Sequence, residues 1–164
     1  MPITPFHFGP GAAIHAIAPK HVSFLAFCTA NVLIDIEPLY YMITGQYPLH
    51  RFFHTYIAAT IITVITALIF FAALKLSSRI TLPNPFHWQS LSLSPIWLGA
   101  ATGTYSHIVF DSVMHIDIAP LSPFSKTNVL YQLIPLGELH LFCLFSAFLG
   151  LVILGIRQLL NSTR

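Results

Sequence analysis

Charge is the scarcest property of this 164-residue chain. Only 7% of its residues are Lys, Arg, Asp or Glu, whereas 55% are hydrophobic, and soluble domains carry roughly 25% charged residues. Nucleic-acid binding is excluded, because it requires clustered Lys and Arg, and the seven basic residues here form no run. The shortage of charge predicts a protein whose solvent is the lipid bilayer.

Cysteine and N-terminal charge are also scarce. The chain has two cysteines, Cys28 and Cys143, and each lies alone in an apolar run. This placement favours buried free thiols over a disulfide or a thiolate metal site. The first basic residue is Lys20, so we expect no secretory signal, which would need a basic start.

Long apolar runs are abundant. Residues 55–74 contain no charge, and residues 95–116 and 139–156 are similarly apolar, so we expect three helices that each cross about 30 Å of hydrocarbon. Residues 22–36 form a shorter run. We expect this helix to end near Asp35, because Pro38 disfavours helical geometry at the preceding residue.

Residues 6–18 are apolar but contain Gly9, Pro10 and Gly11, so two alternatives stay open: a short helix that spans, or a re-entrant segment. Together these runs predict an all-α integral membrane protein, a compact bundle of four to five hydrophobic helices. We expect a single transmembrane domain over residues 1–164. The sequence does not determine its oligomeric state.

The basic residues predict an orientation. If five segments cross the membrane and the first starts outside, most basic residues fall on one side of the membrane. The positive-inside rule predicts that this side, which also holds the C-terminus, is cytoplasmic. These residues are Lys20, Lys75, Arg79, Arg157 and Arg164.

With the five segments arranged in this way, ionisable residues, including all five acids, gather at the outer end of the helix bundle. The set is His7, Asp35, Glu37, His50, His54, Asp111, His115, Asp117, Glu138 and His140. Each ionisable group within a membrane is disfavoured by about 2.5–3.5 kcal/mol on insertion scales. Several at one depth therefore predict mutual pairing or a bound ion.

Helical spacing selects members of this set. His107, Asp111 and His115 recur every four residues and share a helix face. His50 and His54 have the same spacing at the start of the apolar run 55–74, and we expect them to share a face as well. A step of four residues rises about 6 Å, so His107 and Asp111 suit one ion. His115, about 12 Å from His107, is a candidate for a second ion or for an outer shell.

Two further patterns concern the neighbours of these ligands. Gly99 and Gly103 continue the stripe of His107 in a small-xxx-small pattern, which predicts close approach of another helix. Asp35 and Glu37 are two residues apart, and a helix that ends before Pro38 would let both turn toward one site.

Imidazole and carboxylate donors without thiolate suit a divalent metal, with zinc as first choice and manganese as second. One catalytic ion needs about three protein ligands, so the surplus allows two ions about 3.5–4 Å apart. Taken singly, some polar residues fit ordinary interfacial or capping roles. They are His15, His21, His140, Glu138 and Asp117.

The order of four motifs resembles the bacterial inner-membrane family of membrane-bound metal-dependent hydrolases. The motifs are His7 in TPFHFGPG, Asp35 and Glu37 in LIDIEPLYY, His50, Arg51 and His54 in HRFFHT, and His107 and Asp111 in SHIVFD. HRFFHT is one residue shorter than the form typical of the family, and Glu37 stands where the family has aspartate. The resemblance implies a metal-dependent hydrolase of the bacterial inner membrane, with His7 among the ligands.

The leading hypothesis is hydrolysis of a lipid-linked phosphoester by a metal-activated water at the outer end of the bundle. We expect His50, His54, His107, Asp111 and Asp35 to hold the ion. Glu37 is the candidate general base, and Arg51 either binds a phosphate oxygen or pairs with Asp35 or Glu37. The alternatives are a non-catalytic metal-binding or metal-transporting membrane protein and a purely structural polar cluster.

Overall fold

The computed structural model describes residues 4–162, with the side chains of residues 4 and 85–87 excepted, so Arg164 lies outside the described residues. Within that range the fold consists of helices, and no strand is present. The α-helices are α1 (Thr4–Ile17), α2 (Phe24–Ile43), α3 (Tyr56–Ser77), α4 (Leu93–Met114) and α5 (Leu136–Ser162). Two 3-10 helices, η1 (Phe52–His54) and η2 (Pro85–Ser90), lie in the connections before and after α3.

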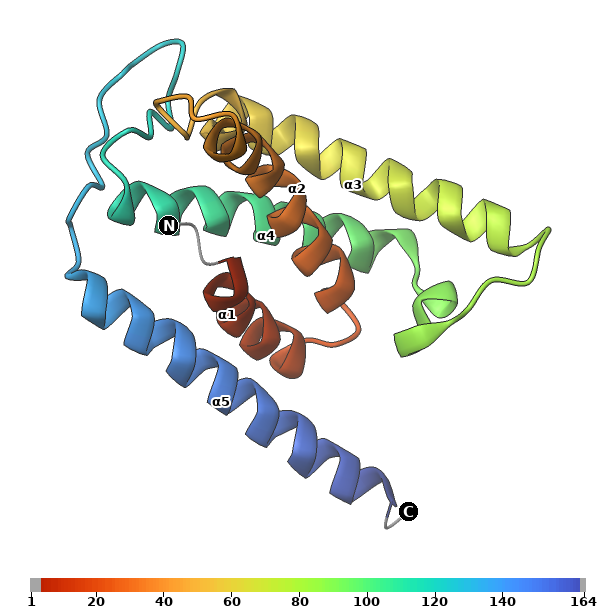
Figure 1. Ribbon diagram of the computed structural model, residues 1–164. Helices are drawn as coiled ribbons and strands as arrows, with labels where there is room; N and C mark the ends of the chain where they lie inside the picture. The colour runs from red at the N-terminus through yellow and green to blue at the C-terminus, as the bar shows by residue number, and fades with distance from the viewer. Residues whose placement is uncertain (1–3, 163–164) are drawn as a thin grey trace.

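Helix α4 lies at the centre of the arrangement. It packs against α2 and α3, whereas α1 packs mainly against α5 and also contacts α2 (Figure 1). Side-chain hydrogen bonds join α3 to α4, since Thr63 Oγ1 lies 2.8 Å from Thr104 Oγ1. The helices that carry the polar motifs are thereby held side by side.

Glycines allow the closest of these contacts. A Cβ added at Gly103 would lie 2.7 Å from the carbonyl oxygen of Phe27, and one at Gly99 would overlap the backbone of Ser23. The expectation that this small-residue face admits another helix is confirmed, and the helix is α2.

The predicted apolar runs correspond to helices, with one error. The segment 6–18 forms a single short helix, α1, with Pro10 inside it. The prediction that the next helix ends near Asp35 is wrong, because α2 continues through Pro38 to Ile43. A proline removes only one intrahelical hydrogen bond, and Pro38 is buried, so packing offsets that loss.

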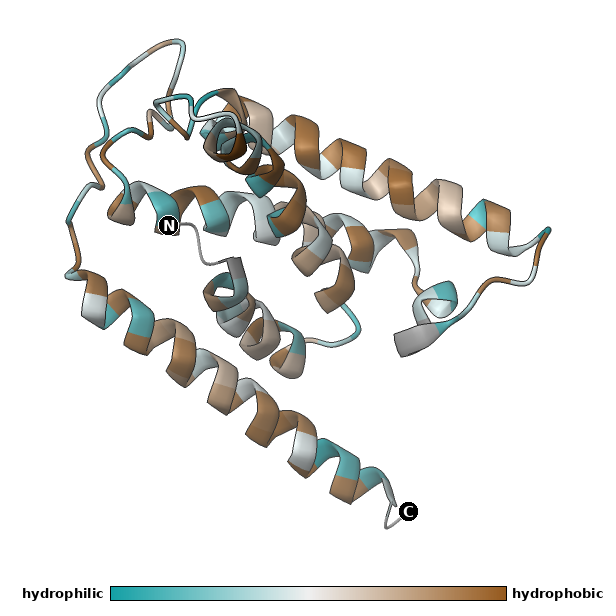
Figure 2. Ribbon diagram, viewed as in Figure 1, coloured by the Kyte–Doolittle hydropathy of each residue, from teal (hydrophilic) through white to brown (hydrophobic). Residues whose placement is uncertain are grey.

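Length and apolar composition make two helices, α3 and α5, capable of crossing a membrane. The run 95–116, which we also expected to span, forms α4 but does not meet this criterion. At 14 residues, α1 is about 21 Å long, which is shorter than the roughly 30 Å of hydrocarbon. Hydrophobic residues cover the outer faces of α3 and α5 (Figure 2).

Candidate metal centre

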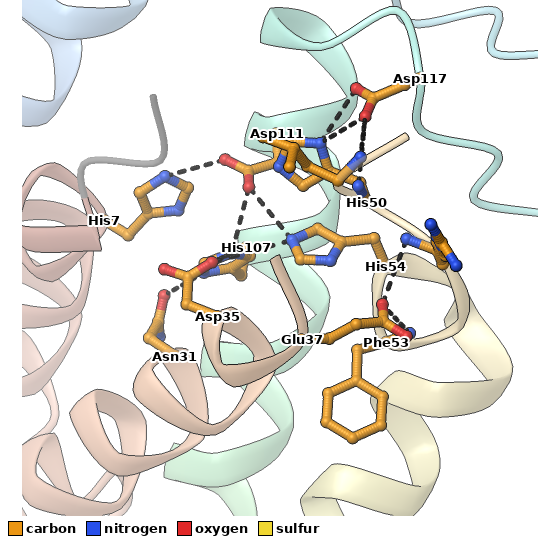
Figure 3. A network of polar contacts seen from close by, with 12 residues as sticks. His7, Asn31, Asp35, Glu37, His50, Phe53, His54, His107, Asp111 and Asp117 are labelled. Carbon is orange, nitrogen blue, oxygen red and sulfur yellow. Dashed lines mark hydrogen bonds and ion pairs between the residues drawn. The ribbon is translucent and has the colours of Figure 1, made fainter. Parts of the chain in front are cut away.

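Four ionisable side chains from three elements meet inside the bundle. Asp35 comes from α2, His54 from η1, and His107 and Asp111 from one face of α4 (Figure 3). One ligand atom from each lies within 4.8 Å of the others. His54, His107 and Asp111 are completely buried, and the side chain of Asp35 is 12% exposed. We refer to these four residues as the inner group.

The spacing of the ligand atoms fits a small divalent ion. Asp111 Oδ2 lies 3.2 Å from His107 Nε2 and 3.3 Å from His54 Nε2. Asp35 Oδ1 lies 3.2 Å from His107 Nε2 and 3.8 Å from His54 Nε2. Ligands at about 2.0–2.2 Å from one ion stand about 3.3 Å apart at the corners of a tetrahedron. The four distances within the inner group are thus close to the spacing of ligands around one such ion.

These short contacts lack hydrogen-bond geometry. Among the described residues, nothing forms a hydrogen bond with the Nε2 atoms of His54 and His107 or with either carboxylate oxygen of Asp111. Polar atoms at full burial without hydrogen bonds are costly, and a cation that accepts their lone pairs removes that cost. The donor chemistry and burial therefore fit a metal ion.

The protonation of His54 suits ligation. Burial lowers the pKa of His54 to about 4, against the opposing effect of the nearby Asp111 carboxylate. The imidazole is consequently neutral near pH 7, which is the form that donates a lone pair to a metal.

Asn31 holds His107 in place from α2. Its Oδ1 lies 2.9 Å from Nδ1 of His107, and both residues are buried. Asn31 was not recognised as a site residue in the sequence. One signal was available, since Asn31 precedes Asp35 by four residues and so shares its helix face.

His7 approaches Asp111 from the side opposite to His54. Its Nε2 lies 3.1 Å from Asp111 Oδ1, and its ring centroid lies 4.4 Å from that of His107. The structure therefore brings His7 to the centre but places it outside the inner group, in contact with a ligand.

His50 belongs to a second cluster. Its ligand atom lies within 4.8 Å of those of Asp111 and His115. The expectation that His50 and His54 share a helix face is wrong, because His50 precedes η1 in irregular backbone and α3 begins only at Tyr56. Their rings are nevertheless 4.6 Å apart.

Asp117 supports this second cluster, although its sequence position alone indicated only a capping or interfacial role. Its carboxylate accepts hydrogen bonds from the His50 ring, at 2.9 Å, and from the backbone amides of Leu49 and His50, both at 3.1 Å. Burial raises the pKa of Asp117, but the hydrogen bonds from His50 outweigh burial and hold that pKa below its usual value.

Glu37 and Arg51 lie beside the inner group. Glu37 Oε2 accepts hydrogen bonds from the backbone amides of Arg51, at 3.1 Å, and Phe53, at 2.8 Å. Because α2 continues through Pro38, Glu37 and Asp35 do not turn to one point, and Glu37 fixes the segment that carries His54. The Arg51 side chain stacks on Tyr41 and donates to the backbone carbonyls of Pro48 and Tyr47.

The remaining acid and histidine of the predicted outer set lie away from both clusters. Glu138 is exposed in the first turn of α5. The ring of His140 lies near that of Phe6, with centroids 4.8 Å apart.

In the comparisons with known proteins, no protein-family model, curated protein or solved structure matches the chain.

Proposed function

We propose that this protein is a membrane-embedded, metal-dependent hydrolase that acts on a lipid-linked phosphoester. The observation that carries the proposal is the inner group, with four ligand atoms from α2, η1 and α4 arranged around one point and no hydrogen bonds to satisfy its buried imidazole Nε2 atoms. Zinc is the expected metal, and manganese is the second choice.

The exposed apolar surface supports a membrane location. Large side chains of α5 are open to the surroundings, with Leu141 and Phe145 each 66% exposed and Leu151 68% exposed. Apolar surface of this extent is rare on soluble monomers. We place the protein in a bacterial inner membrane, with the C-terminus in the cytoplasm and the metal centre toward the outer side. The motif order, which resembles that of membrane-bound metal-dependent hydrolases, is a further reason for this proposal.

Hydrolysis would use a water activated by the metal. The protein supplies the ligands and the hydrogen bonds that hold them in position. Asn31 sets the tautomer of His107, and Glu37 anchors the segment that bears His54. The guanidinium of Arg51 stacks on the ring of Tyr41. We propose that it turns its remaining donors toward a phosphate oxygen and that Glu37 is the general base.

The distribution of polar groups favours hydrolysis over metal transport. A transport pathway requires polar residues at several depths. In α3, residues 61–74 contain no ionisable side chain, and residues 144–154 of α5 contain none either. The clusters lie at the opposite end, where α2 and α4 end and α3 begins, which suits a one-sided site.

The experiment is an assay of purified protein loaded with zinc or manganese against phospholipids and isoprenyl phosphates. We expect product release that a chelator abolishes, with Asp111→Ala protein as background. Arg51→Lys should retain metal but lose much of the rate, since a point charge does not reproduce a forked contact. Product no greater than that of Asp111→Ala on every substrate would exclude the phosphoester hydrolase and favour the metal-binding or transport alternative.

A further inference from the structure

The second cluster contains unused metal donors of its own. His50 is 3% exposed, and its Nε2 forms no hydrogen bond with any described residue; the same holds for the buried Nε2 of His115. The two rings are tilted by 31° to each other, with centroids 4.4 Å apart. Among the described residues, neither Nε2 atom has a hydrogen-bond partner that would explain why the two imidazoles meet.

Asp117 fixes which nitrogen of His50 is available. The carboxylate accepts a hydrogen bond from Nδ1–H, so Nε2 of the neutral imidazole is left as a lone-pair donor. Metal-binding histidines commonly donate their other ring N–H to a carboxylate, which sets the tautomer and strengthens the ligand. Backbone amides of Leu49 and His50 hold the same carboxylate in place. His50 is thus organised as a metal ligand, and Asp117 is its positioning residue.

Asp111 connects this cluster to the inner group. Its ligand atoms lie within 4.8 Å of those of both sets. A carboxylate has two oxygens with about four lone-pair sites, so one carboxylate can bridge two cations. A shared carboxylate is also compatible with the roughly 3.5–4 Å spacing of two-metal sites.

A cavity reaches the second cluster but not the inner group. It has a volume of about 400 Å³, and His50, His115 and Asp117 line it together with Tyr47, Pro48, Leu49 and Ile116. None of the four inner ligands is part of its wall. A ligand that enters this cavity meets the second cluster first.

We propose that His50, Asp111 and His115 bind a second divalent cation, bridged by Asp111 to the first and facing the cavity. This inference rests on the metal centre of the proposed function but not on its catalytic step. The three protein donors leave coordination positions open toward the cavity, and these positions bind a phosphate oxygen of the substrate.

The test counts metal in protein that is loaded with zinc, desalted and analysed by mass spectrometry. We expect two zinc ions per chain in the unaltered protein and one in His115→Ala and His115→Gln. His140→Ala, which changes a histidine at the same end outside both clusters, should retain two. Asp117→Asn should bind the second ion about 10–100-fold more weakly, as outer partners of metal-binding histidines do.

A spectroscopic readout covers the case in which a variant folds poorly. Two manganese ions joined by a carboxylate should give an exchange-coupled electron paramagnetic resonance signal in the unaltered protein, and His115→Gln should give the signal of isolated manganese. One ion per chain in both proteins would overturn the second site while leaving the inner centre intact. No bound metal in the unaltered protein would overturn both this inference and the proposed function.

Discussion

The Nδ1 atom of His107 donates a hydrogen bond to Oδ1 of Asn31, 2.9 Å away, across the contact between α4 and α2. An amide oxygen only accepts, so the proton on this ring resides on Nδ1. The lone pair of Nε2 consequently points at Asp35 and Asp111, each 3.2 Å away. One amide on a neighbouring helix therefore decides which face of the imidazole meets the metal.

Removal of this amide should weaken metal binding without removing a ligand. We expect Asn31→Ala to lower zinc affinity by about 10–100-fold, the usual effect of losing an outer hydrogen bond to a ligand. Asn31→Asp keeps the acceptor and should stay closer to the unaltered value. Titration against a competing chelator measures both. Equal affinity in the alanine variant and the unaltered protein would contradict this role.

Loss of a ligand should have a larger effect than loss of its support. His54→Ala, His107→Ala and Asp111→Ala should each remove the inner ion, because each deletes one of four donors. His21→Ala is the matched control, since His21 is exposed in the turn before α2. Metal content per chain, measured after desalting, distinguishes them. If the ligand variants retain as much metal as His21→Ala, the inner group is not the site.

Helix packing at Gly103 can be tested independently of metal. The added methyl group in Gly103→Ala would meet the Phe27 carbonyl oxygen at 2.7 Å, so we expect a loss of about 1–3 kcal/mol as α2 and α4 separate. Gly155→Ala places the same group in open space on α5 and should raise stability by up to about 1 kcal/mol, because alanine has the higher helix propensity. Thermal unfolding in detergent compares the two, and similar midpoints would contradict the packing argument.

The orientation in the membrane predicts accessibility to a reagent that does not cross it. In a Cys28→Ser, Cys143→Ser background, Asn84→Cys should stay unlabelled in intact spheroplasts, whereas Lys126→Cys should react. Both positions are exposed, in the connections after α3 and after α4. Labelling at position 84 but not at position 126 would reverse the orientation.

Local rules predicted much of this arrangement from the sequence. The four-residue step from His107 to Asp111 correctly placed both side chains on one buried face, and Gly99 and Gly103 correctly marked the contact with a neighbouring helix. These features depend only on helix periodicity, which short stretches of sequence contain.

The errors arose where tertiary contacts decide the outcome. Pro38 reads as a helix end, but burial lets α2 continue past it. The four-residue step from His50 to His54 reads as helical, but Glu37 binds the amides of Arg51 and Phe53 and holds that segment outside α3. The hydrogen bond from His107 to Asn31 joins residues 76 apart in the chain, and no local pattern contains such a pairing.

The pairing of α1 with α5 bears on how the protein is made. Among the described helices, α1, which carries His7, comes first in the chain, and its main packing partner, α5, comes last. The carbonyl oxygen of Cys143 occupies the space beside Gly9, and Ala12 lies against Gly150, so the two helices fit closely only when both are present. Until α5 has been synthesised and inserted, α1 lacks its main packing surface. The contact of His7 with Asp111 therefore depends on a helix that is made after every ligand of the inner group.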